Sequence, residues 1–218
     1  MVLRETQFAL FLRRKVREGA ELNTVWAVLI SYLIGSIPIG YLVVAKWHGL
    51  DIRKYGSGNI GFTNVFRIVG FGPGLIVLVG DIAKGVIAVL LSKQLGGELT
   101  AMLGGLAAIA GHNWSLFLGF SGGRGVATGA GVFFALAPKA ISLSALIWIV
   151  TIALTRYVSL GSILGSIALP ILIIVFYDSW LLFVFGLLAA AFVVYRHRPN
   201  IKRLLNGTEY KFGDKFQR

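Results

Sequence analysis

A loop rich in glycine, asparagine and arginine, DIRKYGSGNIGFTNVFRIVGFGPG, separates two apolar stretches of the chain. Glycine permits positive φ angles, so consecutive backbone N–H groups in such a loop can turn towards one anion. Asparagine and serine side chains add hydrogen-bond donors, and Arg67 can make a bidentate contact with a phosphate. The loop is therefore a candidate phosphate site, and a flexible glycine turn is the simpler alternative. Its small or hydrogen-bonding residues are Gly56, Ser57, Gly58, Asn59, Gly61, Thr63 and Asn64.

A second glycine-rich stretch, GHNWSLFLGFSGGRGVATGAGV, surrounds Arg124. A guanidinium at the N-terminus of a helix suits an oxyanion, because the helix end adds partial positive charge. Close helix packing is the alternative for the glycines, since Gly125/Gly129 and Gly161/Gly165 have small-xxx-small spacing. We expect packing to explain the later glycines and Arg124 to be an anion ligand.

Three ionisable residues lie within or at the mouth of apolar stretches. Asp81 and Lys84 are three residues apart on one helical face, where charges are costly and by default functional. The alternative is that they only neutralise each other. His112 is a further candidate ligand, although a histidine satisfied at the membrane interface is the commoner case.

Polar residues also mark the ends of the later apolar stretches. His197 and Asn200, in YRHRPNI, follow the last stretch, while Ser159 and Ser162 begin an earlier one and could donate hydrogen bonds to an anion. The remaining basic residues of the C-terminal region, Arg203 among them, are expected to contact anionic lipid.

Two familiar patterns lack the structural context that would give them meaning. Gly56–Gly61 satisfies G-x-G-x-x-G but follows an apolar stretch rather than a strand of a βαβ unit. Gly119–Gly123 satisfies G-x-S-x-G, yet no hydrolase sheet is expected around it. The chain has no cysteine, which removes disulfides and thiolate chemistry.

The elements that must position these residues are membrane helices. Of 218 residues, 56% are hydrophobic and only 14% charged, whereas a soluble domain is about a quarter charged. This composition excludes disorder, a coiled coil and an ordinary soluble enzyme, and it predicts an all-α integral membrane protein. A span needs about 20 mostly apolar residues. We expect seven: Thr24–Ala45, Gly74–Leu91, Leu99–Phe120, Gly125–Pro138, Ala140–Thr155, Tyr157–Tyr177 and Ser179–Tyr195.

The basic residues give this topology an orientation. With seven spans, thirteen of the 21 Lys and Arg residues fall on one face, whereas the loops of the other face hold only Lys93 and Lys139. The positive-inside rule then places the C-terminus in the cytoplasm and the N-terminus outside. The polar clusters fall on the same cytoplasmic face. The expected ligand is therefore a soluble, phosphate-bearing anion that meets a membrane surface.

The N-terminal region conflicts with this orientation. Residues 1–23 carry five basic residues on the face that should be poor in them. We leave two explanations open, an interfacial amphipathic helix and an upstream start-site artefact. Residues 24–211 are expected to form one membrane-embedded domain, and residues 212–218 a basic tail.

Four segments resemble, in order and spacing, the motifs of bacterial acyl-phosphate:glycerol-3-phosphate acyltransferases (PlsY). They are GSGNIGFTNVFR, GHNWSLFLGFSGGRGVAT, RYVSLGS and RHRPNIKRLLNGTEYK, within about Val25 to Lys211. The resemblance implies a seven-span enzyme of the bacterial inner membrane with a cytoplasmic site. It would transfer a fatty acyl group from acyl phosphate to glycerol 3-phosphate, forming lysophosphatidic acid and phosphate, without acyl-CoA or acyl carrier protein. The implied partners are the bilayer and the soluble enzyme that makes acyl phosphate; no nucleic acid is expected.

The resemblance also assigns residues to the site. It implies catalytic roles around the two substrates for Arg124, Ser162, His197 and Asn200. The expected substrate- and phosphate-binding residues are Ser57, Gly58, Asn59, Thr63, Asn64, Arg67, Asp81, Lys84, His112 and Ser159. The chain departs from the family pattern at Phe62, usually Ala, and at Ser121 and Arg124, both usually Lys. The departure argues against Ser121 as a catalytic residue.

The expected chemistry needs no metal, cofactor or enzyme nucleophile, because acyl phosphate is an activated mixed anhydride. We expect direct attack by the acceptor hydroxyl, with the leaving phosphate taking the proton, since its second pKa is about 6. His197 as general base is the competing hypothesis. The rival functions are a membrane transporter of an organophosphate anion and a membrane scaffold with a basic tail.

Overall fold

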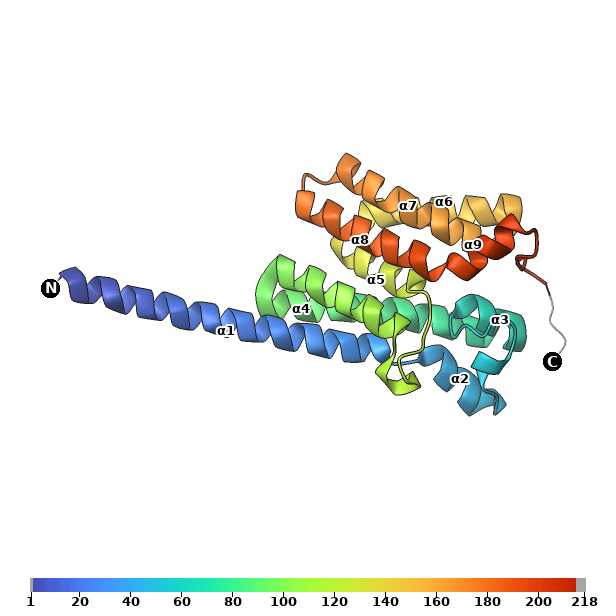
Figure 1. Cartoon of the computed structure of the whole chain (residues 1–218), viewed down its shortest axis with the longest axis horizontal. Helices are drawn as coiled ribbons and strands as arrows, with labels where there is room; N and C mark the ends of the chain where they lie inside the picture. Colours follow the sequence, from blue (N-terminus) through green and yellow to red (C-terminus); the bar gives the residue numbers. More distant parts are fainter. Residues whose placement is uncertain (1, 215–218) are drawn as a thin grey trace.

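The computed structural model describes residues 2–214, with side chains from residue 18 onward. Within this range the chain is helical and has one isolated bridge, Ser115–Ser121, in place of strands. The helices are α1 (Val2–Ser36), α2 (Ile39–His48), α3 (Phe62–Val69), α4 (Phe71–Asn113), α5 (Val126–Leu136), α6 (Pro138–Thr155), α7 (Val158–Phe176), α8 (Trp180–Arg196) and α9 (Arg198–Leu205), with short 3-10 helices η1 (Ile52–Lys54) and η2 (Leu116–Leu118). In Figure 1, α1 lies along α4 and projects beyond the helical body. The all-α prediction is confirmed.

The first expected span, Thr24–Ala45, is not one helix. It breaks between α1 and α2 at Pro38, because proline has no N–H to donate and disfavours helix in the residue before it. On the N-terminal side of the expected span, α1 continues without interruption through residues 2–17. The side chains of residues 2–17 lie outside the described ones, so the two explanations for residues 1–23 stay predictions.

The next two expected spans, Gly74–Leu91 and Leu99–Phe120, both belong to α4. The helix folds back on itself at Gly96 and Gly97, whose backbone angles are not helical, and Gly97 has φ +77°. The two arms then run side by side, which brings Asp81 of the first arm to within 3.5 Å of His112 of the second. The second arm ends at Asn113 instead of Phe120, and η2 follows it.

The apolar helices differ in their capacity to cross a membrane. Among the described residues, four segments are long and apolar enough: Glu18–His48, α4, α6 and α7. A fifth is obtained if α8 and α9 count as one span with a 58° bend. This number is lower than seven because α4 is continuous across its kink, and because α5 and α8 are only 11 and 17 residues long. The count of seven and the sides on which the termini lie remain predictions.

Glycines bring the helices that carry the site into backbone contact. A Cβ on Gly85 of α4 would overlap the Thr128 carbonyl of α5, and one on Gly131 would overlap the Ile82 carbonyl of α4. Gly161 and Gly165 of α7 pack against α6 backbone in the same way, as the small-xxx-small spacing predicts. The expectation is wrong for Gly129, because the nearest atom to its Cβ would be a methyl group 3.8 Å away.

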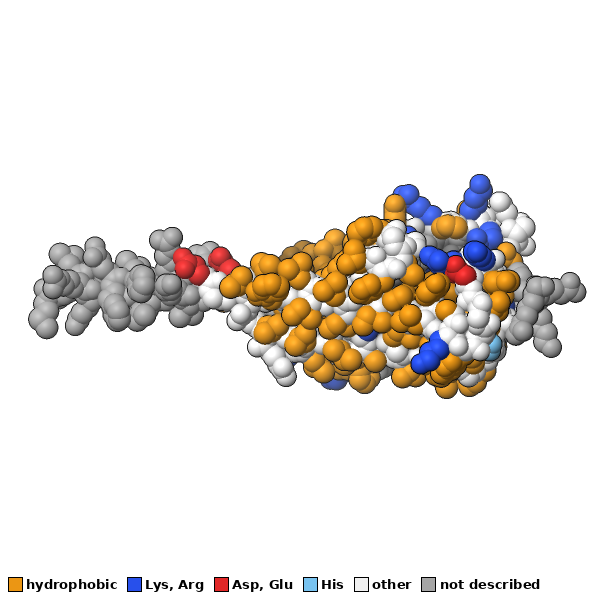
Figure 2. Space-filling view, turned by 90° about the horizontal axis from the view of Figure 1, so that it is seen from below, with side chains coloured by type: hydrophobic (Ala, Val, Ile, Leu, Met, Phe, Trp, Pro, Cys, Tyr) orange, Lys and Arg blue, Asp and Glu red, His pale blue; other side chains and the backbone are white. Residues whose placement is uncertain are grey.

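The main hydrophobic core lies between α4, α5, α7 and α8. It includes Val89, Ile109, Phe133, Ile173 and Phe185, all buried. The outside is also apolar: Figure 2 shows hydrophobic side chains covering most of the body, with most of the visible Lys and Arg gathered at the end away from the N-terminal helix. Such an extensive apolar surface is what contact with lipid requires.

Candidate functional site

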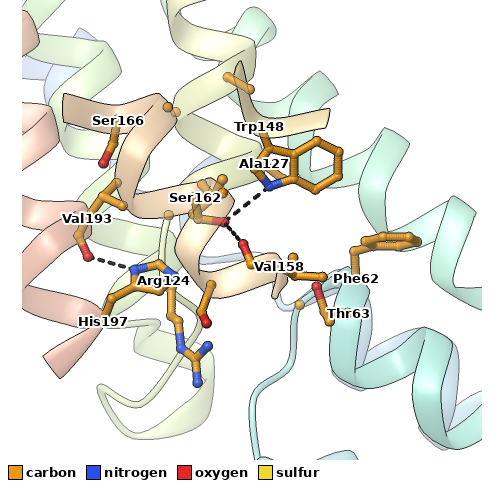
Figure 3. A pocket seen from close by; sticks show the side chains of 18 of the residues that line it. Phe62, Thr63, Arg124, Ala127, Trp148, Val158, Ser162, Ser166, Val193 and His197 are labelled. Carbon is orange, nitrogen blue, oxygen red and sulfur yellow. Dashed lines mark hydrogen bonds between the residues drawn. The ribbon is translucent and has the colours of Figure 1, made fainter. Parts of the chain in front are cut away.

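A cavity of about 330 Å³ opens where the charged end of the body meets the helix bundle. It is lined by the glycine-rich loop and α3, the beginnings of α5 and α7, the end of α8, and α9 (Figure 3). Most of its polar residues lie in the loop or near these helix ends, although Asp81, Ser144 and Ser166 lie inside helices. Phe133, Leu169 and Ala189 are apolar lining residues about two turns or more from the same ends. The cavity therefore joins a polar mouth to an apolar channel.

Most of the expected site residues line this one cavity. They are Ser57, Asn59, Thr63, Asn64, Arg67, Asp81, His112, Arg124, Ser159, Ser162, His197 and Asn200. Gly58 and Lys84 do not line it, and neither does Ser121, whose hydroxyl donates to the Leu118 carbonyl.

The glycine-rich loop is shaped by the buried Asn64. Its Nδ2 donates to the carbonyls of Tyr55 (3.0 Å) and Asn59 (2.9 Å), and its Oδ1 accepts from the Ser57 N–H at 2.9 Å. Gly58 adopts φ +71°, a left-handed conformation that glycine tolerates best. The loop is therefore an organised turn rather than a flexible one. Asn64 holds it together from inside, while Ser57 and Thr63 line the cavity.

Arg67 and Arg124 supply positive charge to the mouth. Burial lowers the pKa of Arg67, and it lowers the pKa of Arg124 to about 10, where repulsion from Arg203 adds to the effect. Both guanidiniums stay charged at neutral pH. Because each is poorly hydrated, an anion that enters the cavity gains a strong electrostatic partner.

The loop that carries Arg124 is anchored at both sides. The Gly123 N–H donates to the His112 carbonyl at 2.9 Å, and the Arg196 guanidinium donates to the Gly123 carbonyl at 2.7 Å. Gly125 follows with φ +78° and is the N-cap of α5. These contacts fix Arg124 at the N-terminus of α5, the arrangement that the sequence predicts for an anion ligand.

His197 presents a defined tautomer to the cavity. Its Nδ1 lies 2.7 Å from the Val193 carbonyl oxygen, which can only accept, so Nδ1 carries the proton and Nε2 a lone pair (Figure 3). His197 follows the last residue of α8 and lies outside that span. Burial, with repulsion from Arg124, lowers its pKa to about 4, so the ring is neutral at physiological pH.

Ser162 is held by two hydrogen bonds. Its hydroxyl donates to the Val158 carbonyl at 3.0 Å and accepts from the indole N–H of Trp148 at 3.3 Å (Figure 3). Ser162 and Trp148 both line the cavity. A serine whose proton is directed at a backbone carbonyl is suited to accept or relay a hydrogen bond, and no general base is bonded to it.

Asp81, Lys84 and His112 form a buried cluster between the arms of α4. Lys84 Nζ lies 2.8 Å from Asp81 Oδ1 and 2.8 Å from His112 Nδ1, and it donates to the Ile37 carbonyl at 3.2 Å. The three Lys84 contacts match the three donors of an ammonium group. Lys84 therefore neutralises Asp81 and ties α4 to the break after α1, and substrate binding by this cluster stays a prediction.

The comparisons with known proteins agree with the geometry. The family model described as glycerol-3-phosphate acyltransferase matches residues 25–207, most of the chain. The chain belongs to this family. The glycerol-3-phosphate acyltransferase of Desulforamulus reducens is 50% identical over 195 residues, covering 89% of this chain and 98% of the relative. Glycerol-3-phosphate acyltransferase 2 of Moorella thermoacetica is 53% identical over 189 residues, covering 87% and 97%.

Solved structures of the acyltransferase family share the fold. The crystal structure of PlsY (YgiH), an integral membrane glycerol 3-phosphate acyltransferase, in its glycerol 3-phosphate form has a TM-score of 0.83 and 40% identity, and it covers 87% of this chain and 96% of its own. The lysophosphatidic acid form has a TM-score of 0.81 and 39% identity, covering 87% and 95%. The expected PlsY family is thus confirmed.

Some residues of this cavity were not expected from the sequence, among them Trp148, Arg203, Glu209 and Tyr210. The assignment of Arg203 to lipid contact alone is wrong, because its side chain is ion-paired to the buried Glu209 at 2.7 Å. The fourth motif, RHRPNIKRLLNGTEYK, contains Arg203, Glu209 and Tyr210, and this was the available signal. Trp148 had none, since a tryptophan in an apolar helix is ordinarily a packing residue.

Proposed function

We propose that this member of the glycerol-3-phosphate acyltransferase family transfers a fatty acyl group from acyl phosphate to glycerol 3-phosphate. The products are lysophosphatidic acid and inorganic phosphate, at the start of phospholipid synthesis. One observation carries the proposal: a single cavity joins a mouth that bears Arg67, Arg124 and Arg203 to an apolar channel between α5, α7 and α8. Phosphate groups match the mouth, and an acyl chain matches the channel.

The proposed reaction is direct. An acceptor hydroxyl oxygen attacks the acyl carbon, the bond from that carbon to the phosphate oxygen breaks, and the hydroxyl proton passes to the departing phosphate. A phosphate with a second pKa of about 6 can take this proton. Among the described residues that line the cavity, no serine is hydrogen-bonded to a histidine, so the site offers no activated serine for an acyl-enzyme.

Several groups of the cavity have proposed roles in this step. The Nε2 lone pair of His197 accepts a hydrogen bond from the attacking hydroxyl and orients it, and its low pKa argues against a role as the main proton acceptor. Arg124 and the N-terminus of α5 stabilise the charge that develops on the acyl oxygen and the leaving phosphate. Donors of this kind contribute roughly 10²–10³ in rate each in comparable sites. Ser162 and Asn200 complete the set of groups around the substrates.

We also propose the cellular setting. The chain would lie in the bacterial inner membrane with seven apolar helical segments, the N-terminus outside, and the C-terminus and the polar mouth in the cytoplasm. The gathering of Lys and Arg at one end of the body supports this orientation (Figure 2). Acyl phosphate would be supplied by the soluble enzyme that makes it, and glycerol 3-phosphate would enter from the cytoplasm.

The deciding assay uses purified protein in detergent micelles with palmitoyl phosphate and glycerol 3-phosphate, without acyl-CoA or acyl carrier protein. We expect lysophosphatidic acid to form. A preparation that forms none, but takes up glycerol 3-phosphate in liposomes, would replace this proposal with the transporter hypothesis.

Arg67→Ala provides the companion test. It should impair glycerol 3-phosphate use far more than Arg198→Ala, because Arg198 lies against the Tyr195 ring and does not line the cavity. Arg203, a basic residue of the same region, is not a valid control because it belongs to the site. Equal effects of Arg67→Ala and Arg198→Ala would reduce Arg67 to surface charge.

A further inference from the structure

The apolar channel of the cavity is closed at its inner end. Phe133 of α5, Ile141 of α6 and Leu169 of α7 line the cavity there, and all three pack into the main hydrophobic core. The Phe133 ring lies against Phe185 with centroids 5.0 Å apart. Phe185 and Ile173 belong to the same core but do not line the cavity. Phe133, Ile141 and Leu169 therefore form the floor of the channel.

The depth of this floor follows from helix geometry. Arg124 lies at the mouth just before α5, and Phe133 is nine residues further along; Ser159 lies at the mouth in α7, and Leu169 is ten residues further along. At about 1.5 Å per residue, these separations place the floor roughly 13–15 Å from the mouth. The hydrocarbon core of a bilayer is about 30 Å thick, so an acyl chain of one leaflet covers about 15 Å. An acyl chain of ordinary membrane length whose phosphate end lies at the mouth therefore reaches the floor.

Two hydroxyl groups lie nearer the mouth than the floor does. Ser166 comes three residues before Leu169 in α7, and Figure 3 shows it beyond Ser162 as seen from the mouth. Ser144 comes three residues after Ile141 in α6, which packs antiparallel to α7. The floor itself presents only hydrocarbon, which suits the methyl end of an acyl chain.

We propose that this floor selects the length of the acyl donor, with Phe133 as the residue that stops the methyl end of the chain. The inference rests on the proposed function and adds chain-length selection to it. A tail that leaves lipid or detergent for the channel gains little from the hydrophobic effect, because both surroundings are apolar. Length is therefore selected by fit: a chain that ends at the floor keeps its contacts, whereas a longer chain overpacks the core. Overpacking of this kind lowers affinity by roughly tenfold or more.

The test changes the depth of the channel in both directions. Phe133→Leu deepens it, whereas Ala130→Leu makes it shallower, because Ala130 lines the cavity one turn nearer the mouth on the same helix. Phe134→Leu is the matched control, since Phe134 is the next residue, is 60% exposed and does not line the cavity.

Each protein is assayed with glycerol 3-phosphate and a series of donors: lauroyl, myristoyl, palmitoyl, stearoyl and arachidoyl phosphate, at equal mole fraction in mixed micelles. For the wild type and Phe134→Leu, kcat/KM should reach a maximum and then fall roughly tenfold at the longest donor. The maximum should move to a longer donor in Phe133→Leu and to a shorter donor in Ala130→Leu, by at least one member of the series.

A binding measurement separates this proposal from the proposed function. Alkyl phosphates from dodecyl to eicosyl phosphate carry the same tails but no acyl group to transfer. The chain length that raises the melting temperature most should shift in the two variants as the kinetic maximum does. If no acyl phosphate is used and no lysophosphatidic acid forms, the proposed function fails, while the alkyl phosphate series still reports the length that the floor accepts.

Two outcomes would overturn the proposal. One is a chain-length profile that is the same in the wild type and in Ala130→Leu, a variant that leaves the packed core ring in place and so keeps the test open if Phe133→Leu does not fold. The other is a profile without a fall at the longest chains in either series, which would mean that the tail leaves the channel between the helices and enters the lipid.

Discussion

Removal of the Lys84 ammonium tests whether the cluster between the two arms of α4 stabilises the fold or binds substrate. Lys84→Met keeps an unbranched apolar stem but removes the ammonium group. It leaves Asp81 as a buried, uncompensated charge and frees the Ile37 carbonyl at the break after α1. The Lys84 and Asp81 side chains are only 4% and 3% exposed. Breaking a buried pair from one side costs about 3–5 kcal/mol of stability. For a chain of this length, each kcal/mol lost lowers the melting temperature by roughly 2–4 °C, so the melting temperature should fall by roughly 6–20 °C.

The assay is thermal unfolding of the purified protein in detergent, followed by intrinsic fluorescence. Lys93→Met is the matched control, because Lys93 is an exposed lysine of the same helix. In the double variant Asp81→Leu/Lys84→Met, where neither charge remains, part of the loss should be recovered. A Lys84→Met protein that melts like the wild type but has a raised KM for glycerol 3-phosphate would refute this reasoning and make Lys84 a substrate ligand.

Three further predictions concern the helix crossing, the serine and the histidine. Gly131→Ala should yield little folded protein, as judged by gel filtration, because its Cβ has no space against α4. Gly129→Ala should give a folded yield like that of the wild type, and equal yields of the two variants would contradict the crossing. Trp148→Phe removes the indole N–H that holds Ser162, and we expect kcat to fall roughly three- to tenfold with the melting temperature nearly unchanged. Because the pKa of His197 is lowered to about 4, the ring is already largely neutral near pH 6, where we expect the phosphate to produce an acid limb in the pH profile of kcat. His197→Gln should therefore lower kcat without moving this limb. Disappearance of the limb would make His197 the general base.

The sequence was informative about burial and about local charge. Apolar stretches of about 20 residues predicted the membrane helices, because lipid contact requires nearly every residue of a span to be apolar. The placement of Arg67 and Arg124 at glycine-rich helix ends predicted an anion site, and both line the cavity. Spacing also brought Asp81 and Lys84 together, since residues three apart share one face of a helix.

Contacts between distant segments could not be predicted in this way. The fold-back of α4 at Gly97 brings His112 to Lys84, 28 residues away, so that a pair suggested by local spacing becomes a cluster of three. The small-residue spacing at Gly125/Gly129 indicated helix packing, but the tight crossing is at Gly85 and Gly131. Which glycine of α5 faces α4 depends on the rotation of the helix in the assembled bundle.

The sequence by itself determined that this is a helical membrane protein with its hydrogen-bonding and basic residues gathered at helix ends, and its motifs indicated the family. The tertiary structure decided which of those residues remain available to a ligand. Arg203 was predicted to touch lipid and is a cavity residue, because Glu209 pairs with it and also bonds Ser159, 50 residues away along the chain. Hydrophobic patterning encodes which side chains leave water, whereas the pairing of one buried polar group with another is fixed only when the helices pack.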